Sequence, residues 1–424
     1  MDIVKEEVRR PVELPFWQQA GAFLLACGIV VSRRPDALIH PQFWAEDGHV
    51  WFAEAYNLGW GTALFRTYAG YFQTLPRLGA ALALLVPLAL APLALNLIAI
   101  AVQALPVSLL LSARSSAWGS LRYRVAMAAL LLALPNAREI GAIITNSQWV
   151  LALCAFLVLV AVAPKSNAGK LFDVFILMLC GLTGPFCVFL FPIAVWQAWR
   201  KADVWRWMKA GLLAMLCLVQ GWGLLVMDRG GRADAPLGAG ASLFVRILGG
   251  HVFLGALVGC NQLASFSNPL VITALFCAAV VGVVLIAGCF ARATVEMRLF
   301  VLFAFAIFAA ALVSPESYPA AGFTRWQSLA AAGGVRYWFL PTLAFAWSLL
   351  WCFRSRIAVL RPLAACLLVT MCFGIVRDWE LPALTNLHFH EEAERFHAAP
   401  VGSAVVIPEN PQGWSIELTR KAGR

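Results

Sequence analysis

The chain has 424 residues, of which 61% are hydrophobic and only 13% charged, and its formal net charge is +10. A soluble domain carries about twice this share of charged residues, so the composition predicts a membrane protein and excludes a disordered or collagen-like chain. The apolar runs are long and continuous rather than alternating at every second residue, which excludes an outer-membrane β-barrel.

Apolar runs that could cross a bilayer follow one another from Phe16 to Val376. A spanning helix needs about 20 apolar residues, and one long run is divided by a break that contains glycine and proline. The charged residues before Phe16 do not form a secretory signal, so the first run is expected to be retained. We predict eleven spans, at 16–32, 92–112, 121–135, 148–163, 171–182, 184–199, 209–227, 268–290, 298–314, 335–353 and 362–376.

Lys and Arg residues indicate on which side of the membrane each loop lies. If residues 1–15 are cytoplasmic and 76–90 lies at the outer interface without crossing, the later basic loops fall inside and face anionic lipid. Arg33 and Arg34 are the exception, because this arrangement places them outside. The basic residues are dispersed rather than gathered on one face, so nucleic acid is excluded as a partner. The predicted parts are a membrane domain, 1–376, and a short external tail, 377–424.

The first outer loop, residues 33–90, contains two adjacent carboxylates, Glu46 and Asp47, before a helical pattern. A carboxylate held at the membrane surface is partly desolvated, which raises its pKa and suits it to act as a general base. We therefore predict Asp47 and Glu46 as catalytic residues. The alternative is that Asp47 caps the helix and Glu46 is solvated. The pair could bind a divalent cation, but no third oxygen ligand is identifiable, and no metal site or cofactor is assigned.

The same loop continues with arginines interleaved with tyrosines: Arg66, Tyr68, Tyr71 and Arg77. Guanidinium groups bind phosphate oxygens in pairs, and aromatic rings border lipid chains. This pattern favours a lipid-phosphate site. An ordinary aromatic belt with snorkelling arginines explains it equally well.

Two later outer segments carry further candidates. Asn146 and Gln148 begin a span on the outer side and could bind sugar, although Asn146 could instead cap its helix. Arg325, in the loop 314–334, and the pair Arg336 and Tyr337 could form the second half of a phosphate clamp. The alternative is that they anchor the next span at the interface.

The tail is predicted to contain a helix, one strand and a turn. Residues 387–398 have a helical pattern, so His388 and His390 point to different faces and do not suggest a metal site. Residues 401–407 have the pattern of a strand, followed by a turn. The eleven cysteines lie mostly in apolar stretches without metal-binding spacing, which is typical of core residues.

Several short motifs together carry a resemblance to a known family. They are Phe43–Gly48, Tyr68–Tyr71, Leu75–Arg77, Asn146–Trp149, Gly181–Phe186, Arg336–Pro341 and Ile407–Trp414. The set resembles bacterial multi-pass membrane proteins that are in turn similar to the GT-C superfamily of polyprenyl-phosphate-sugar glycosyltransferases. That superfamily has an acidic pair in the first outer loop, before juxtamembrane helices, as at Glu46–Asp47 and 76–90. The large outer C-terminal domain of many members has no counterpart in the short tail.

The resemblance implies an all-α GT-C-like protein of the bacterial inner membrane with a periplasmic C-terminus. It implies inverting transfer of a sugar from a polyprenyl-phosphate carrier to a periplasmic or lipid-linked envelope glycan, with Asp47 as general base and arginines stabilising the departing phosphate. A transporter or flippase of polyprenyl-linked sugars is an alternative, although few charges lie within spans. An O-antigen polymerase or ligase is another, and would be favoured if the arginines proved indispensable.

Overall fold

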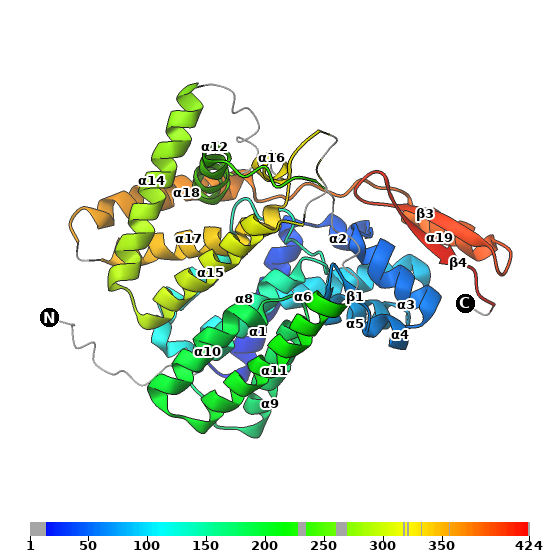
Figure 1. The fold of residues 1–424 in the computed structure, drawn as a ribbon, viewed down its shortest axis with the longest axis horizontal. Coiled ribbons are helices and arrows are strands. Elements are labelled where there is room, and N and C mark those ends of the chain that lie inside the picture. Colours follow the sequence, from blue (N-terminus) through cyan, green and yellow to red (C-terminus); the bar gives the residue numbers. More distant parts are fainter. Residues whose placement is uncertain are drawn as a thin grey trace.

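The computed structural model describes residues 14–227, 235–259, 269–316, 319, 322–331, 333–355 and 357–422. The predicted cytoplasmic residues 1–13 lie outside this set. The chain is mainly helical (Figure 1). Its elements are α1 (Phe16–Arg33), α2 (Asp36–Ile39), η1 (Asp47–Phe52), α3 (Ala53–Leu58), α4 (Trp60–Leu64), β1 (Thr67–Tyr68), β2 (Tyr71–Phe72), α5 (Thr74–Ala83), η2 (Leu88–Leu90), α6 (Ala91–Leu111), η3 (Ala113–Trp118), α7 (Leu121–Leu132), α8 (Ser147–Val160), α9 (Asn167–Gly181), α10 (Cys187–Lys201), α11 (Val204–Val226), α12 (Ala241–Val245), η4 (Arg246–Leu254), α13 (Gly255–Val258), α14 (Pro269–Arg292), α15 (Val295–Val313), α16 (Arg325–Ala330), η6 (Val335–Trp338), α17 (Phe339–Arg354), α18 (Leu360–Arg377), α19 (Phe389–Ala398), β3 (Ala404–Glu409) and β4 (Trp414–Thr419).

Six helices among the described residues are long and apolar enough to cross a membrane. They are Leu88–Leu111, Val204–Val226, Ala241–Val258, Ile272–Arg292, Val295–Val313 and Leu360–Arg377. Their number and composition make this chain an α-helical membrane protein. The predicted count of eleven also relies on shorter helices such as α7, which has 12 residues, so length and composition do not establish it.

One of the six apolar helices lies between the predicted spans 209–227 and 268–290, where no span was predicted. Residues 241–258 form a continuous helix through α12, η4 and α13. Just before it, Pro236 O accepts a hydrogen bond from Arg325 N at 3.0 Å. Midway along it, His251 O accepts one from Asn136 Nδ2 at 3.0 Å. Just after it, Gly259 lies beside Asp378. The helix itself packs on α14, α17 and α18, so a helix of the bundle stands where no span was predicted.

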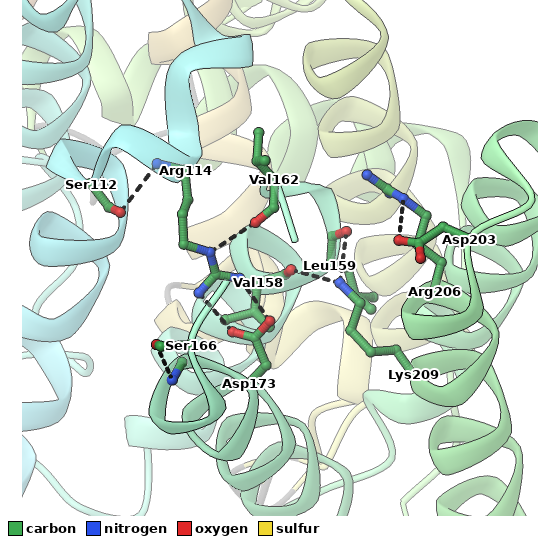
Figure 2. A network of polar contacts seen from close by, with 11 residues as sticks. Ser112, Arg114, Val158, Leu159, Val162, Ser166, Asp173, Asp203, Arg206 and Lys209 are labelled. Atoms are coloured by element: carbon green, nitrogen blue, oxygen red, sulfur yellow. Dashed lines mark hydrogen bonds and ion pairs between the residues drawn. The ribbon is translucent and has the colours of Figure 1, made fainter. Parts of the chain in front are cut away.

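The centre of the bundle is α8, in which every residue is buried. The end of this helix leaves backbone carbonyl groups without helical partners, and an apolar core offers no water to bind them. Lys209 Nζ lies 3.1 Å from Val158 O and 3.4 Å from Leu159 O. Arg114 Nε donates to Val162 O at 2.8 Å, and its guanidinium binds Asp173 through two bonds of 2.9 and 2.7 Å (Figure 2). Lys209 and Arg114 thus provide partners for the backbone carbonyl groups at the buried end of α8.

The first outer loop contains a short helix rather than a crossing at residues 76–90. Helix α5 has 10 residues, which span about 15 Å, half of the roughly 30 Å hydrocarbon core of a bilayer. A tight turn precedes it. Ala69 and Gly70 have positive φ angles of 53° and 89°, and this turn pairs Tyr68 directly with Tyr71 in the β1–β2 hairpin. Both rings therefore lie on the same face of the hairpin.

The tail forms a small unit that packs on the first outer loop. It contains the expected helix, α19, but its strand prediction is incomplete, because β3 pairs antiparallel with a second strand, β4. The hairpin and α19 extend from one end of the bundle (Figure 1). The tail is joined to the loop by a bridge between Trp44 and Asn410 and by His49 Nδ1, which lies 2.7 Å from Ser415 O.

Candidate functional site

A cavity of about 580 Å³ lies where the first outer loop meets the start of α8, the segment before α17 and the turn of the tail hairpin. One wall is apolar and comes from the bundle helices, through residues such as Phe189, Leu224 and Ala311. The opposite wall is polar and aromatic. It contains Trp44, Glu46, Trp51, Tyr68, Tyr71, Gln73, Asn146, Gln148, Trp149, Arg336 and Tyr337. Most of the predicted site residues therefore meet at one cavity.

The tyrosines of the β1–β2 hairpin are fixed by neighbours on both sides. The ring of Tyr68 meets Trp51 edge to face at 5.3 Å. Tyr71 donates a hydrogen bond to Glu316 Oε2 at 2.7 Å. Burial, reinforced by the negative charge of Glu316, raises the pKa of Tyr71 well above its usual value. Tyr71 thus stays protonated and acts as a hydrogen-bond donor.

Arg336 and Tyr337 hold the segment around Glu316 against the cavity. Arg336 forms an ion pair with Glu139 at 3.2 Å and donates from Nη2 to Glu316 O at 2.6 Å. Tyr337 donates to the same carbonyl at 2.8 Å. The charge of Arg336 is therefore balanced by Glu139, and the guanidinium lies at the cavity with a fixed orientation.

Amide and indole groups at the cavity retain unused hydrogen-bonding capacity. Asn146 Nδ2 donates a hydrogen bond to Glu139 O at 2.9 Å, and Gln73 Nε2 donates to Gln148 Oε1 at 3.3 Å. Gln73 Oε1 and Trp149 Nε1 are buried and have no hydrogen-bond partner among the described residues. A buried polar group without a partner costs about 1–3 kcal/mol.

The two adjacent carboxylates occupy different positions. Glu46 lines the cavity. Asp47 is only 2% exposed and is not among the lining residues. Its Oδ1 accepts hydrogen bonds from Thr145 N, at 3.0 Å, and from Thr145 Oγ1. The expected alternative, in which Asp47 caps its own helix, is wrong, because no side-chain cap is formed there.

The surroundings of Asp47 favour its protonated form more than those of an exposed aspartate do. Burial, and secondarily the charge of Glu46, raises the pKa of Asp47 to about 7, although the hydrogen bonds from Thr145 oppose this shift. Trp51 Nε1 donates to the same threonine hydroxyl at 2.8 Å. Asp47 therefore fixes Thr145, which lines the cavity, and lies behind Glu46 rather than in contact with the cavity.

A third carboxylate near this pair was missed in the sequence. Glu409, the last residue of β3, is 2% exposed. It lies so close to Gly48 that a methyl group there would collide with its carboxylate. Burial and the charges of Asp47 and Glu46 raise the pKa of Glu409 to about 9. A single glutamate in a predicted strand gives little signal, since the pairing of the tail with the loop is long-range.

Three predicted arginines do not line the cavity. Arg77 is 2% exposed and binds Glu54 at 2.7 Å, with its guanidinium 5.0 Å from the centre of the Trp51 ring. Arg66 lies 3.6 Å from the same Glu54. Arg325 donates to Ala235 O at 2.7 Å. Local partners hold these three arginines away from this cavity.

Comparisons with known proteins add no identification. The chain matches no family model, and no curated protein matches it. Among the described residues, no group of three or more His, Cys, Asp or Glu side chains is placed to hold a metal ion. A functional assignment therefore depends on the cavity itself.

Proposed function

We propose that this protein is a GT-C-like glycosyltransferase that moves a sugar from a polyprenyl-phosphate carrier to an envelope glycan acceptor. The observation that carries the proposal is a single cavity with an apolar wall from the bundle helices and a polar wall that contains Glu46 and Arg336. The apolar wall suits a prenyl chain, and the amide groups of Asn146 and Gln148 on the polar wall suit sugar hydroxyls. The site is proposed to lie on the periplasmic side of the bacterial inner membrane.

In the proposed reaction, Glu46 takes the proton of an acceptor hydroxyl. The acceptor oxygen attacks the anomeric carbon, and the bond from that carbon to the phosphate oxygen breaks with inversion. Arg336 stabilises the negative charge on the departing polyprenyl phosphate. We assign the base to Glu46 rather than Asp47, since Glu46 is the carboxylate that lines the cavity. Asp47 is then a positioning residue that orients Thr145 and the adjoining loop.

The test measures sugar transfer in proteoliposomes that contain a polyprenyl-phosphate sugar and envelope glycans extracted from a strain without the protein. General-base catalysis contributes roughly 10²–10⁴-fold, so Glu46→Gln should reduce turnover by at least a hundredfold. Glu417→Gln, at an exposed position on β4, is the matched control and should retain full activity. Full activity in Glu46→Gln would refute the proposed base, and loss in Asp47→Asn alone would return that role to Asp47.

The same proteoliposomes separate this proposal from transport. A flippase would move the intact lipid-linked sugar across the bilayer and release no polyprenyl phosphate. A transferase releases one polyprenyl phosphate for each sugar transferred. Translocation without release would therefore overturn the proposed reaction. A polymerase or ligase would be recognised by the size of the glycan product, measured by mass spectrometry.

A further inference from the structure

A second cavity, of about 280 Å³, lies directly beside the first. Three residues line both cavities and thus form the wall between them: Trp44, Glu139 and Pro411. Glu46, the proposed base, lines the larger cavity next to Trp44. A group bound in the smaller cavity therefore lies against residues that also border the proposed reaction site.

The two cavities differ in the chemistry of their walls. The smaller one has no lining residue from α10, α11 or α15, which supply the apolar wall of the larger one. Its walls come from the loop that follows α7, the segment 382–385 and the hairpin turn 410–412. Arg34, Arg138 and Gln412 are among the polar residues that line it. These walls suit a water-soluble group rather than a lipid chain.

The smaller cavity is preformed, and its charged lining residues are two arginines, Arg34 and Arg138, and one carboxylate, Glu139. Arg34 is 4% exposed and donates to the carbonyl oxygens of Gly141, Arg138 and Pro382 at 2.8, 3.1 and 3.3 Å. These acceptors are uncharged, so the positive charge of its guanidinium is not cancelled by them. Arg34 Nε is buried without a hydrogen-bond partner among the described residues.

The tail completes this cavity through a second set of fixed contacts. Asn410 Oδ1 accepts from Thr385 N at 3.0 Å, and Asn410 Nδ2 donates to Thr385 O at 2.9 Å. The amide therefore joins the hairpin turn to the segment 382–385. Both walls supplied by the tail hold their positions before any ligand binds, which reduces the entropy lost on binding.

We propose that the smaller cavity binds the acceptor substrate, a saccharide unit that carries a phosphate or a carboxylate. This inference rests on the proposed transferase function. A transferase with two substrates needs two adjoining sites, and Trp44, Glu139 and Pro411 form the boundary at which these two cavities meet. Arg34 and Arg138 select negative charge on the acceptor, and the indole of Trp44 supplies an apolar face for the sugar ring.

The first experiment measures binding without catalysis. Glucose 6-phosphate, glucuronate and glucose are the probes, and saturation-transfer NMR detects their contact with the full-length protein in detergent. We expect both anionic probes to bind at least fivefold more tightly than glucose. Stronger binding of glucose 6-phosphate would indicate a phosphorylated acceptor, and stronger binding of glucuronate an acidic sugar. Equal binding of all three probes would refute selection by charge.

The decisive experiment uses a variant whose side chain fills the smaller cavity. Ala383 is exposed and lines only the smaller cavity. Ala383→Trp should therefore weaken binding of the anionic probes at least tenfold. Ala398→Trp places the same side chain at the exposed end of α19 and should leave binding unchanged. Arg138→Gln removes one cation without adding bulk, and serves as the test if Ala383→Trp fails to fold. It should weaken binding of the two anionic probes and leave binding of glucose unchanged. If the anionic probes bind to folded Ala383→Trp and to folded Arg138→Gln as they do to wild type, the proposed acceptor site is refuted.

A kinetic measurement distinguishes failure of this inference from failure of the proposed function. Ala383→Trp should raise the KM for acceptor at least tenfold, whereas the control Ala398→Trp should leave both the acceptor KM and the slow hydrolysis of the lipid-linked sugar by water unchanged. If probes bind as expected but Glu46→Gln keeps full transfer activity, the cavity is an anionic saccharide site and the transferase mechanism is wrong. If transfer requires Glu46 but Ala383→Trp has normal acceptor KM, only the acceptor site is wrong.

Discussion

The carboxylate of Glu409 offers a direct test of how the tail is held on the first outer loop. Its pKa is raised from the ordinary 4.5 to about 9 in the folded protein. A group that binds its proton more tightly when folded makes the folded state less stable as the pH rises from the unfolded pKa to the folded one. The docking of the tail should therefore weaken between pH 5 and pH 9.

The size of the effect follows from these two values. One pKa unit corresponds to about 1.4 kcal/mol. Ionisation of Glu409 therefore reduces the free energy that docks the tail on the loop by about 1 kcal/mol at pH 5 and by about 5 kcal/mol at pH 8. The difference of about 4 kcal/mol is close to a thousandfold in the opening equilibrium. Glu409→Gln keeps the shape of the side chain and carries no charge at any pH. Its tail should show almost no such dependence.

Amide hydrogen exchange in β3 and β4 measures this opening. Wild type and Glu409→Gln are compared at the same pH, so that the intrinsic exchange rate cancels. We expect the variant to exchange more slowly than wild type at pH 8, by roughly 10³–10⁴-fold, and within tenfold of it at pH 5. Glu417→Gln, on the exposed face of β4, should follow wild type. Identical pH dependence in wild type and Glu409→Gln would refute this reasoning.

Three further predictions concern the contacts that support the site and the bundle. Asp173→Asn leaves the guanidinium of Arg114 without its carboxylate at the buried end of α8, and should lower the free energy of unfolding by about 3 kcal/mol, seen as an earlier thermal transition in detergent. Arg77→Met leaves the partly exposed Glu54 with Arg66 as its remaining partner, at 3.6 Å, and should cost about 2 kcal/mol in the same assay; an unchanged melting temperature would show that the pair contributes nothing. Gly48→Ala forces the tail away from η1, and overpacking of about 1–3 kcal/mol should speed hydrogen exchange in β3 at least fivefold while the thermal transition of the bundle stays in place.

Local sequence patterns correctly predicted much of the helical framework. The first apolar run, 16–32, corresponds to α1, and the last, 362–376, to α18. The segment 387–398 was expected to be a helix and contains α19. Each of these elements is specified by its own residues, because hydrophobic periodicity and run length act within one segment. The class of the protein, α-helical and membrane-embedded, follows from the same signal.

The sequence was less informative for segments whose role depends on a distant partner. The apolar helix at 241–258 has the length of a span, yet its neighbours are Arg325, Asn136 and Asp378. Arg77 has the spacing of a phosphate ligand, yet Glu54 neutralises it. The helix at 241–258 was therefore missed in the sequence, whereas the pattern around Arg77 was recognised and a contact from elsewhere in the chain decided its use.

By itself, the sequence determined that this chain folds into apolar helices and that acidic and aromatic residues gather in its first outer loop. Only the tertiary structure decided which of two adjacent carboxylates faces the cavity, because Thr145, almost a hundred positions later, binds Asp47 and leaves Glu46 at the cavity. It also brought Glu409 against that pair from the end of the chain. Hydrogen bonds and burial between such distant segments depend on packing, and no periodicity within a single segment encodes them.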